Sequence, residues 1–145
     1  MKKENPAKDF LKRYLWLRGR VEALERAINQ AMERAFSTSV RLKEITVMSS
    51  PAVHDPMAEN VVKAVDELET LYECKQKVVQ SLREILDAID SLPDERQKQL
   101  LTMRYINGDD FSAIMERMHY EKTQMYVIHG RALVEINKWL EGHNV

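Results

Sequence analysis

FLKRYLWLRGRVEALERAINQAMERAFSTSVRLKEI, residues 10–45, is the stretch that decides the fold. A 3.5-residue repeat places side chains on one stripe of an α-helix and favours packing against a second helix. No proline interrupts this repeat after Pro6, which suits the first turn of a helix. The sequence therefore predicts a long helix from about residue 6 to about residue 45. Its seam alternates steps of four and three: Phe10, Tyr14, Leu17, Val21, Leu24, Ile28, Ala31, Ala35, Thr38, Leu42 and Ile45.

A second seam follows a break in the pattern. Between Thr46 and Asp55 the sequence TVMSSPAVHD loses the repeat, and Asp55-Pro56 is typical of an N-cap followed by proline in the first helical turn. The sequence predicts a second helix over residues 56–91. Its polar member, Lys75, either packs its stem on the seam with the ammonium in water or fixes the register of the pairing. The predicted seam is Val61, Val65, Leu68, Tyr72, Lys75, Val79, Leu82, Leu86 and Ile89.

The two predicted helices carry opposite charges. Residues 1–46 hold 11 basic and 6 acidic side chains, whereas residues 47–93 hold 4 and 9. Two helices of similar length with a short connection most simply fold back as an antiparallel hairpin, and the opposite charges favour that pairing over self-pairing. One seam serves an intramolecular hairpin and a swapped dimer equally well. We expect an all-α protein whose residues 1–92 form a long antiparallel coiled-coil helical hairpin.

The remaining residues, 93–145, are predicted to form a three-helix domain with a helix-turn-helix. Pro93 and the acids after it begin a helix that Asn107-Gly108 ends, since glycine tolerates the left-handed cap. Asp110 caps a short helix from Phe111 to Met118, and a last helix runs from about Glu121 to Leu140. Three helices with a short middle one match the arrangement in which the third helix enters a DNA groove. The inward face expected for the first helix is Leu100, Leu101, Met103 or Arg104 at the margin, Tyr105 and Ile106. The face expected for the last helix is Met125, Ile128, Ala132, Leu133, Ile136 and Trp139 or Leu140.

The stretch LLTMRYINGDDFSAIMERMHYEKTQMYVIHGRALVEINKWL, residues 100–140, resembles sigma-factor region 4 in the order of its features. These are an Arg-Tyr and a glycine closing the first helix, a short helix containing isoleucine, a tight turn, and a helix with Ile128 followed four residues later by Ala132-Leu133. With the hairpin before it, the chain resembles small phage and prophage regulators of the ArpU and RinA type. The resemblance implies a late-gene transcription regulator that binds double-stranded DNA.

By the pattern of that family, the outward side of the last helix carries Lys122, Thr123, Gln124, Tyr126, Val127 and Arg131 as DNA-binding residues. Lys122 and Arg131 can reach phosphates, Gln124 can read an adenine edge, and Val127 can touch a thymine methyl. A solvated helix surface is the alternative for the whole set, and Tyr126 can instead pack against the domain or a second subunit.

Two positions and the charge of the last helix depart from the family pattern. Met115 replaces a small alanine, Glu121 replaces a capping Ser or Thr, and the last helix has no net charge. Over residues 121–141, Lys122, Arg131 and Lys138 are balanced by Glu121, Glu135 and Glu141. A neutral helix lacks the charge that usually supplies non-specific DNA affinity. Either DNA binding is weak and assisted by a partner protein, or the role in DNA binding has been reduced.

Several classes of function find no support in the sequence. No constellation of nucleophile, base and orienting group is visible, so we expect no enzyme. The four histidines, at 54, 119, 129 and 143, lack a metal-ligand spacing, and the single Cys74 excludes an intramolecular disulfide and a cysteine zinc site. We expect no metal and no cofactor. The charged start MKKENPAKDF and the absence of a long apolar run predict a cytoplasmic protein without membrane contact. The resemblance to phage regulators implies that this cytoplasm is that of a bacterial host.

The leading hypothesis is a DNA-binding, phage-type transcription regulator whose hairpin serves dimerisation or contacts RNA polymerase. A homo-oligomer, most simply a dimer, is expected. The first alternative is an adaptor that docks on RNA polymerase without reading DNA. The second is a packaging protein like a phage terminase small subunit, although that class usually places its DNA-binding part first.

Overall fold

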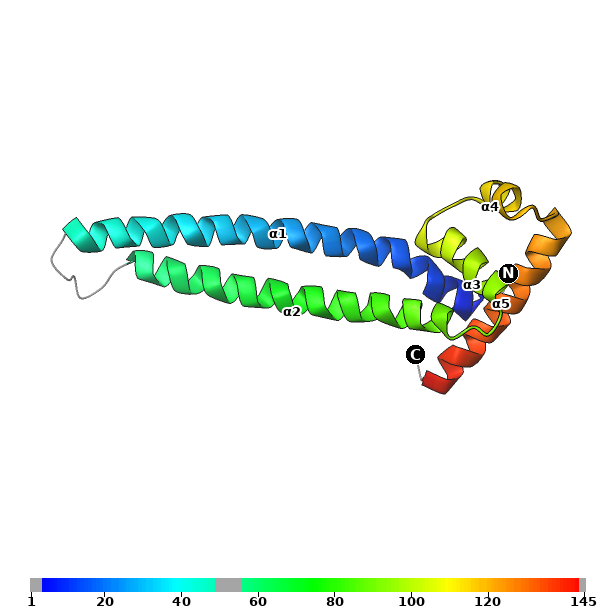
Figure 1. Ribbon diagram of the computed structural model, residues 1–145. Helices are drawn as coiled ribbons and strands as arrows, with labels where there is room; N and C mark the ends of the chain where they lie inside the picture. Colours follow the sequence, from blue (N-terminus) through cyan, green and yellow to red (C-terminus); the bar gives the residue numbers. More distant parts are fainter. Residues whose placement is uncertain (1–3, 49–55, 144–145) are drawn as a thin grey trace. The chain divides into compact units, whose positions relative to one another are not determined.

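The computed structural model describes residues 4–48 and 56–143, and every regular element in these residues is a helix (Figure 1). In chain order they are α1 (Pro6–Met48), α2 (Pro56–Asp90), α3 (Glu95–Leu101), the π-helix η1 (Thr102–Ile106), α4 (Phe111–Met118) and α5 (Lys122–His143). Helices α1 and α2 form the expected long antiparallel hairpin, and three shorter packed helices follow. The all-α prediction is confirmed. No helix in the described residues is long and apolar enough to cross a membrane.

Helix α1 begins where the sequence places it and buries the predicted seam. The side-chain Oδ1 of Asn5 accepts a hydrogen bond from the Ala7 N–H at 3.1 Å, which caps the helix directly before Pro6. Along the seam, Phe10, Leu17, Ile28 and Ala31 are buried. The seam positions between and after them, up to Thr38, are half-buried. The predicted members Leu42 and Ile45 lie outside the described side chains, and the predicted cap Asp55 lies outside the described residues.

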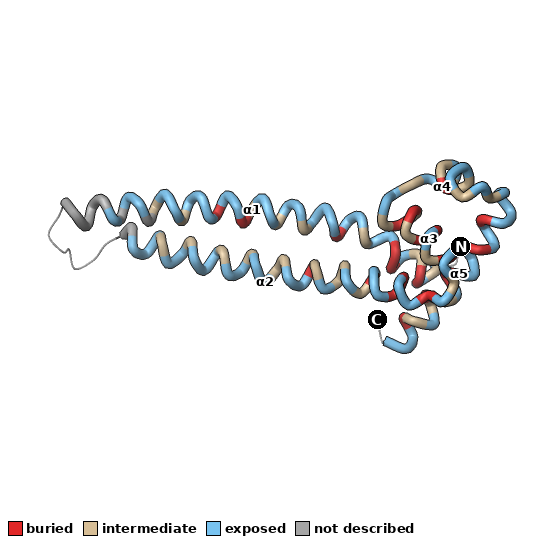
Figure 2. Tube along the Cα trace, in the orientation of Figure 1, coloured by how far each residue is buried: buried red, intermediate tan, exposed pale blue. Residues whose placement is uncertain are grey.

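The seam predicted for α2 is wrong at three positions, whereas the predicted Val79 is half-buried. Val65, Tyr72 and Leu86 are exposed, while their neighbours one residue earlier, Ala64, Leu71 and Ile85, are half-buried or buried. The observed seam is Val61, Ala64, Leu68, Leu71, Lys75, Val78, Leu82, Ile85 and Ile89. Both sets have 4-3 spacing and both are apolar, so the repeat alone does not choose between them. The side of α2 that packs on α1 decides between the two sets, and Figure 2 shows half-buried and buried positions recurring along the helix.

Lys75 occupies a seam position, and its ammonium forms an ion pair with Glu25 of α1 at 3.3 Å. The side chain is half-buried, so the stem packs on the seam while the charged end reaches its partner. A second pair joins Arg34 Nη2 to Glu67 Oε1 at 3.0 Å. In both pairs a base of one helix meets an acid of the other, as in antiparallel coiled coils, where flanking charges set partner and orientation.

The chain divides into two compact units that are not separated at residue 92. Residues 20–79 form one unit, and residues 1–19 together with 80–145 form the other. The ends of both hairpin helices therefore belong to the unit that contains α3, α4 and α5. The core of this unit takes Ala7, Phe10 and Leu11 from α1, Ile85, Ala88 and Ile89 from α2, and the buried faces of the last four elements.

The first helix of the C-terminal part changes its winding after Leu101. Leu100, Leu101, Met103 and Tyr105 are all buried. A helix of 3.6 residues per turn cannot keep this spacing on one face, and the five residues from Thr102 to Ile106 form a π-helix instead. Of the predicted inward residues Ile106 is only half-buried, and the widened turn is not predicted by the sequence pattern. Gly108, at φ 79°, then reverses the chain as expected, and a Cβ there would lie 3.3 Å from Leu15 Cδ1.

The corrected seam of α2 predicts opposite results for two adjacent residues. Ile85 is 1% exposed and Leu86 is 42% exposed. Ile85→Ala is expected to lower the free energy of unfolding by about 2–5 kcal/mol, because it leaves a cavity in the core. Leu86→Ala should cost less than about 1 kcal/mol. Urea unfolding of both variants measures these free energies. An equal or larger loss of stability for Leu86→Ala would contradict the corrected seam and support the one predicted from the repeat.

Candidate nucleic-acid interface

Helices α4 and α5 are joined by a tight turn whose geometry is built from local hydrogen bonds. Asp110 caps α4 as predicted, with its Oδ1 accepting from the Ala113 N–H at 2.8 Å. His119 ends α4 in the left-handed conformation, at φ 55°, and the Tyr120 N–H donates to the Met115 carbonyl. The Glu121 carbonyl then accepts from the Met125 N–H, so α5 begins at Lys122. Short helix, tight turn and longer helix follow one another as in a helix-turn-helix.

The inner face of α5 holds the domain together. Helix α3 packs on α5, and the π-helix η1 packs on α4. The inward residues expected for α5, Met125, Ile128, Ala132, Leu133 and Ile136, are all buried. On α4, Ile114 is buried, while Phe111, Met115 and Met118 are half-buried. Met115, in place of a small residue, keeps part of its surface exposed.

Four of the six predicted DNA-binding residues share the outward face of α5. Thr123, Val127 and Arg131 are spaced by four residues and fall on one side of the helix, with Gln124 beside them. All four are exposed. Gly130 lies between them on the same side, and a Cβ added there would meet no atom within 4 Å. This face is therefore open to close approach by another molecule.

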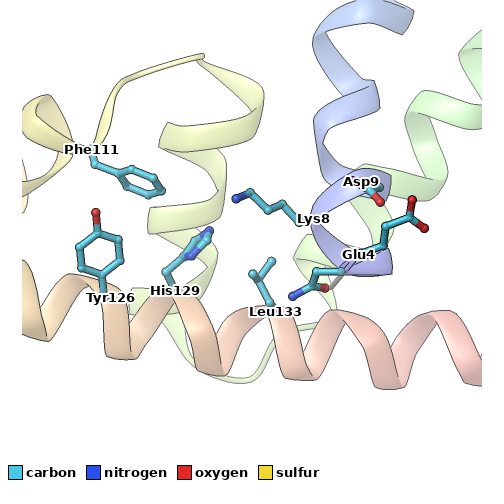
Figure 3. Close-up of a pocket in the computed structure, with 8 residues that line it drawn as sticks. Glu4, Lys8, Asp9, Phe111, Tyr126, His129 and Leu133 are labelled. Atoms are coloured by element: carbon cyan, nitrogen blue, oxygen red, sulfur yellow. The ribbon is translucent and has the colours of Figure 1, made fainter. Parts of the chain in front are cut away.

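The other two predicted residues, Lys122 and Tyr126, lie along a different edge of α5. The spacing of residues 122, 126, 129 and 133 places them on one line, which runs into a cleft of about 490 Å³ (Figure 3). In the cleft, Tyr126 points toward Phe111 of α4, with ring centroids 5.7 Å apart. Half of the Tyr126 surface is nevertheless exposed. The Tyr126 ring thus contacts the domain, as the alternative expects, while DNA contact by its exposed part stays a prediction.

His129 forms the floor of this cleft and is the polar side chain that the sequence analysis leaves without a role. It is 8% exposed, and its Nε2 is hydrogen-bonded to Tyr105 Oη at 2.8 Å. The rings of Tyr105 and Phe111 pack on it, with centroids 5.9 and 5.3 Å away. Burial, helped by the positive charges of Lys8 and Arg104, lowers the pKa of His129 from 6.5 to about 4. The ring is thus neutral near pH 7 and serves the core.

Ion pairs within the domain leave some cations of α5 unpaired. Arg117 pairs with Asp109, at 3.5 Å, and Lys138 pairs with Glu135, at 3.1 Å. Lys122 and Arg131 form no ion pair among the described residues. Since an intramolecular salt bridge must be broken before a phosphate can take its place, these two are the cations of α5 most readily available to an anionic partner.

The sequence analysis overlooks Val134 and Lys138 on the outward face. Both are exposed, and they extend the line of Val127 and Arg131 by seven residues each. Extending the helical spacing beyond the family pattern would have found them. The outward face is therefore longer and more apolar than the six predicted residues indicate.

Comparison with known proteins gives one family. The family described as "Protein of unknown function (DUF1492)" matches residues 38–137, more than half of the chain. The chain belongs to this family. The matched region of this DUF1492 protein covers the end of α1, all of α2 and the helix-turn-helix. No curated protein and no solved structure matches the chain.

The structure offers no obvious place for a metal in the residues that it describes, since no group of three His, Cys, Asp or Glu side chains converges there. Cys74 is a free, half-buried thiol on α2. His54 lies outside the described residues.

The lowered pKa of His129 predicts a pH-dependent stability. Between about pH 6.5 and pH 4 the unfolded chain binds a proton at this position and the folded chain does not, so the free energy of unfolding falls as the pH falls through this window. His129→Gln keeps a hydrogen-bonding group for Tyr105 but cannot titrate. Thermal melts from pH 7.5 to 4.5 should show a smaller loss of stability for this variant. Identical pH profiles would contradict a neutral, buried His129.

Proposed function

We propose that this DUF1492 protein is a DNA-binding transcription regulator of the phage type. Its α4–turn–α5 unit contacts double-stranded promoter DNA, and α5 enters the groove. The hairpin provides the contact with a second protein, either another copy in a dimer or RNA polymerase. The proposal contains no catalytic step, cofactor or metal, and places the protein in the bacterial cytoplasm.

The observation that carries the proposal is the outward face of α5. A helix that follows a tight turn from a short capped helix presents Thr123, Gln124, Val127 and Arg131 to solvent, around an open Gly130. These side chains include a hydrogen-bonding amide and hydroxyl, an apolar group and an unpaired cation, which are the groups that read base edges and hold phosphates. A helix surface that served only solubility would not need an exposed apolar group such as Val127 among its polar side chains.

The balance of charge limits how α5 can act. Each phosphate contact contributes affinity through the counterions that it releases, and α5 supplies Lys122 and Arg131 for such contacts. Two contacts give little affinity alone. A regulator of this design gains affinity when two copies bind neighbouring half-sites, or when a protein partner holds it at the promoter.

A second candidate function is an adaptor that docks on RNA polymerase through the same face without reading DNA. The exposed apolar groups of Val127 and Val134 favour it, because apolar side chains at the centre of a surface are typical of protein interfaces. The net charge of α5 is only +1, from Lys122, Arg131 and Lys138 against Glu135 and Glu141, and this low charge is compatible with this use of the face.

Fluorescence anisotropy with the DNA upstream of its own gene, at several salt concentrations, tests DNA binding. Lys122→Ala with Arg131→Ala is expected to weaken binding and to reduce the slope of log K against log salt by about 2, since about 0.9 is lost per phosphate contact. Arg41→Ala with Lys63→Ala changes the net charge equally, on exposed positions of the hairpin. This control should leave affinity and slope unchanged.

If the two double variants weaken binding equally, the assigned face is wrong. If the unaltered protein binds no DNA but captures purified host RNA polymerase, and Val127→Ser with Val134→Ser abolishes this capture, the adaptor replaces the regulator as the function of this face.

A further inference from the structure

The unit formed by residues 20–79 has an apolar surface that its own two helices leave uncovered. Five exposed side chains form it, and we call them the hairpin strip: Met32, Phe36, Val62, Val65 and Tyr72. Phe36 is 72% exposed and Tyr72 is 46% exposed. Large apolar groups gathered on one surface mark sites of interaction, whereas scattered ones need no explanation.

The contacts between the helices show that the strip lies on one side of the hairpin. The Tyr72 hydroxyl lies 3.9 Å from the Met32 sulfur, so these two side chains meet across the groove between α1 and α2. Phe36 follows Met32 by one turn, and Val65 precedes Tyr72 by two turns, as the antiparallel direction requires for further neighbours. The Arg34–Glu67 ion pair closes the opposite side of the seam.

The two sides of this unit differ in charge. Acids border the strip, with Glu33 next to Met32, Asp66 next to Val65, and Glu69 and Glu73 on either side of Tyr72. All four are exposed. The opposite side carries exposed cations, of which Arg34, Arg41 and Lys63 are examples. An apolar surface with an acidic border is complementary to a basic surface with apolar side chains at its centre.

A second copy of the chain fits the strip poorly. In a symmetric dimer the same surface meets itself, so two strips face to face would bring together the acidic borders of both copies. Glu69 lies within the strip, between Val65 and Tyr72, and would be buried in such an interface. Burying a carboxylate without a cation is costly.

We propose that the hairpin strip binds a basic amphipathic helix of another protein. Apolar side chains of that helix pack on Phe36 and Tyr72, and its Lys or Arg side chains pair with Glu69 and its acidic neighbours. Helices recognise such grooves through anchors spaced at one turn. The inference deepens the proposed function, because it gives the chemistry of the protein partner of the hairpin, and it does not depend on DNA binding by α5.

Binding of two fluorescein-labelled model peptides to the full chain tests the inference. Both are amphipathic helices with leucines on one face, and they differ only in lysine or glutamate on the flanks. The lysine peptide is expected to bind at least about tenfold more tightly than the glutamate peptide. Phe36→Ser with Tyr72→Ser should weaken its binding by about tenfold or more, as loss of central aromatic anchors does.

Two further variants serve as controls. Trp16→Ser with Leu86→Ser removes equally exposed apolar groups outside the strip and should leave peptide binding unchanged. Glu69→Gln with Glu73→Gln should weaken binding of the lysine peptide and reduce its salt dependence. The strip variant should keep the DNA affinity of the unaltered protein, so failure of the strip and failure of DNA binding are seen separately.

Equal affinity for both peptides, or an equal loss with the Trp16→Ser, Leu86→Ser variant, overturns the inference. So does sedimentation equilibrium that finds a dimer for the unaltered protein and a monomer for the Phe36→Ser, Tyr72→Ser variant, because the strip is then the contact between two copies.

Discussion

Burial of the first turns of α1 in the core of the C-terminal domain is the constraint on which the rest of the unit depends. Ala7 and Leu11 have no exposed surface, and Phe10 packs on Trp139 near the other end of the chain. Asn5 both caps α1 and accepts a hydrogen bond from Asn137. The C-terminal domain therefore needs the first turns of α1 as well as α5. Helix α1 covers one flank of α5, while the outward face of α5 stays in solvent.

This arrangement explains the separation of roles along α5. The flank that faces α1 carries His129 and Leu133, which are buried, and Tyr126, which lies over the cleft. The side away from α3 carries the exposed groups proposed to meet DNA. A neutral, buried His129 beside Tyr105 is a structural device, and its pKa of about 4 follows from burial near two cations. The lowered pKa of His129 thus affects the stability of the fold and has no role at the exposed face of α5.

Much of the fold could be predicted from the sequence because its signals are local. The repeat of α1, the Asp110 cap and the Gly108 turn each depend on a few neighbouring residues, and each is confirmed. The second seam could not be chosen from its repeat, since Val65 and Ala64 both fit a 4-3 pattern. The grouping of residues 1–19 with the C-terminal domain depends on contacts between distant segments, which no local pattern contains. The π-helical winding of η1 has no signal in the repeat either.

The candidate site could be predicted only in part for a similar reason. The family pattern gives positions along α5, but the neighbours of those positions decide their surroundings. Phe111 and α1 draw Tyr126 toward the cleft, whereas Thr123, Gln124, Val127 and Arg131 have no such cover. The net charge of the whole chain does not predict the charge of the site on α5, because it is a sum over surfaces of opposite sign, such as the two sides of the hairpin.

Amide hydrogen exchange of the full chain, with and without the DNA upstream of its own gene, tests the central claim most directly. DNA should slow exchange over residues 122–131 and the turn before them and leave residues 20–79 unchanged. Slowing confined to residues 20–79, with none in α5, would contradict the account.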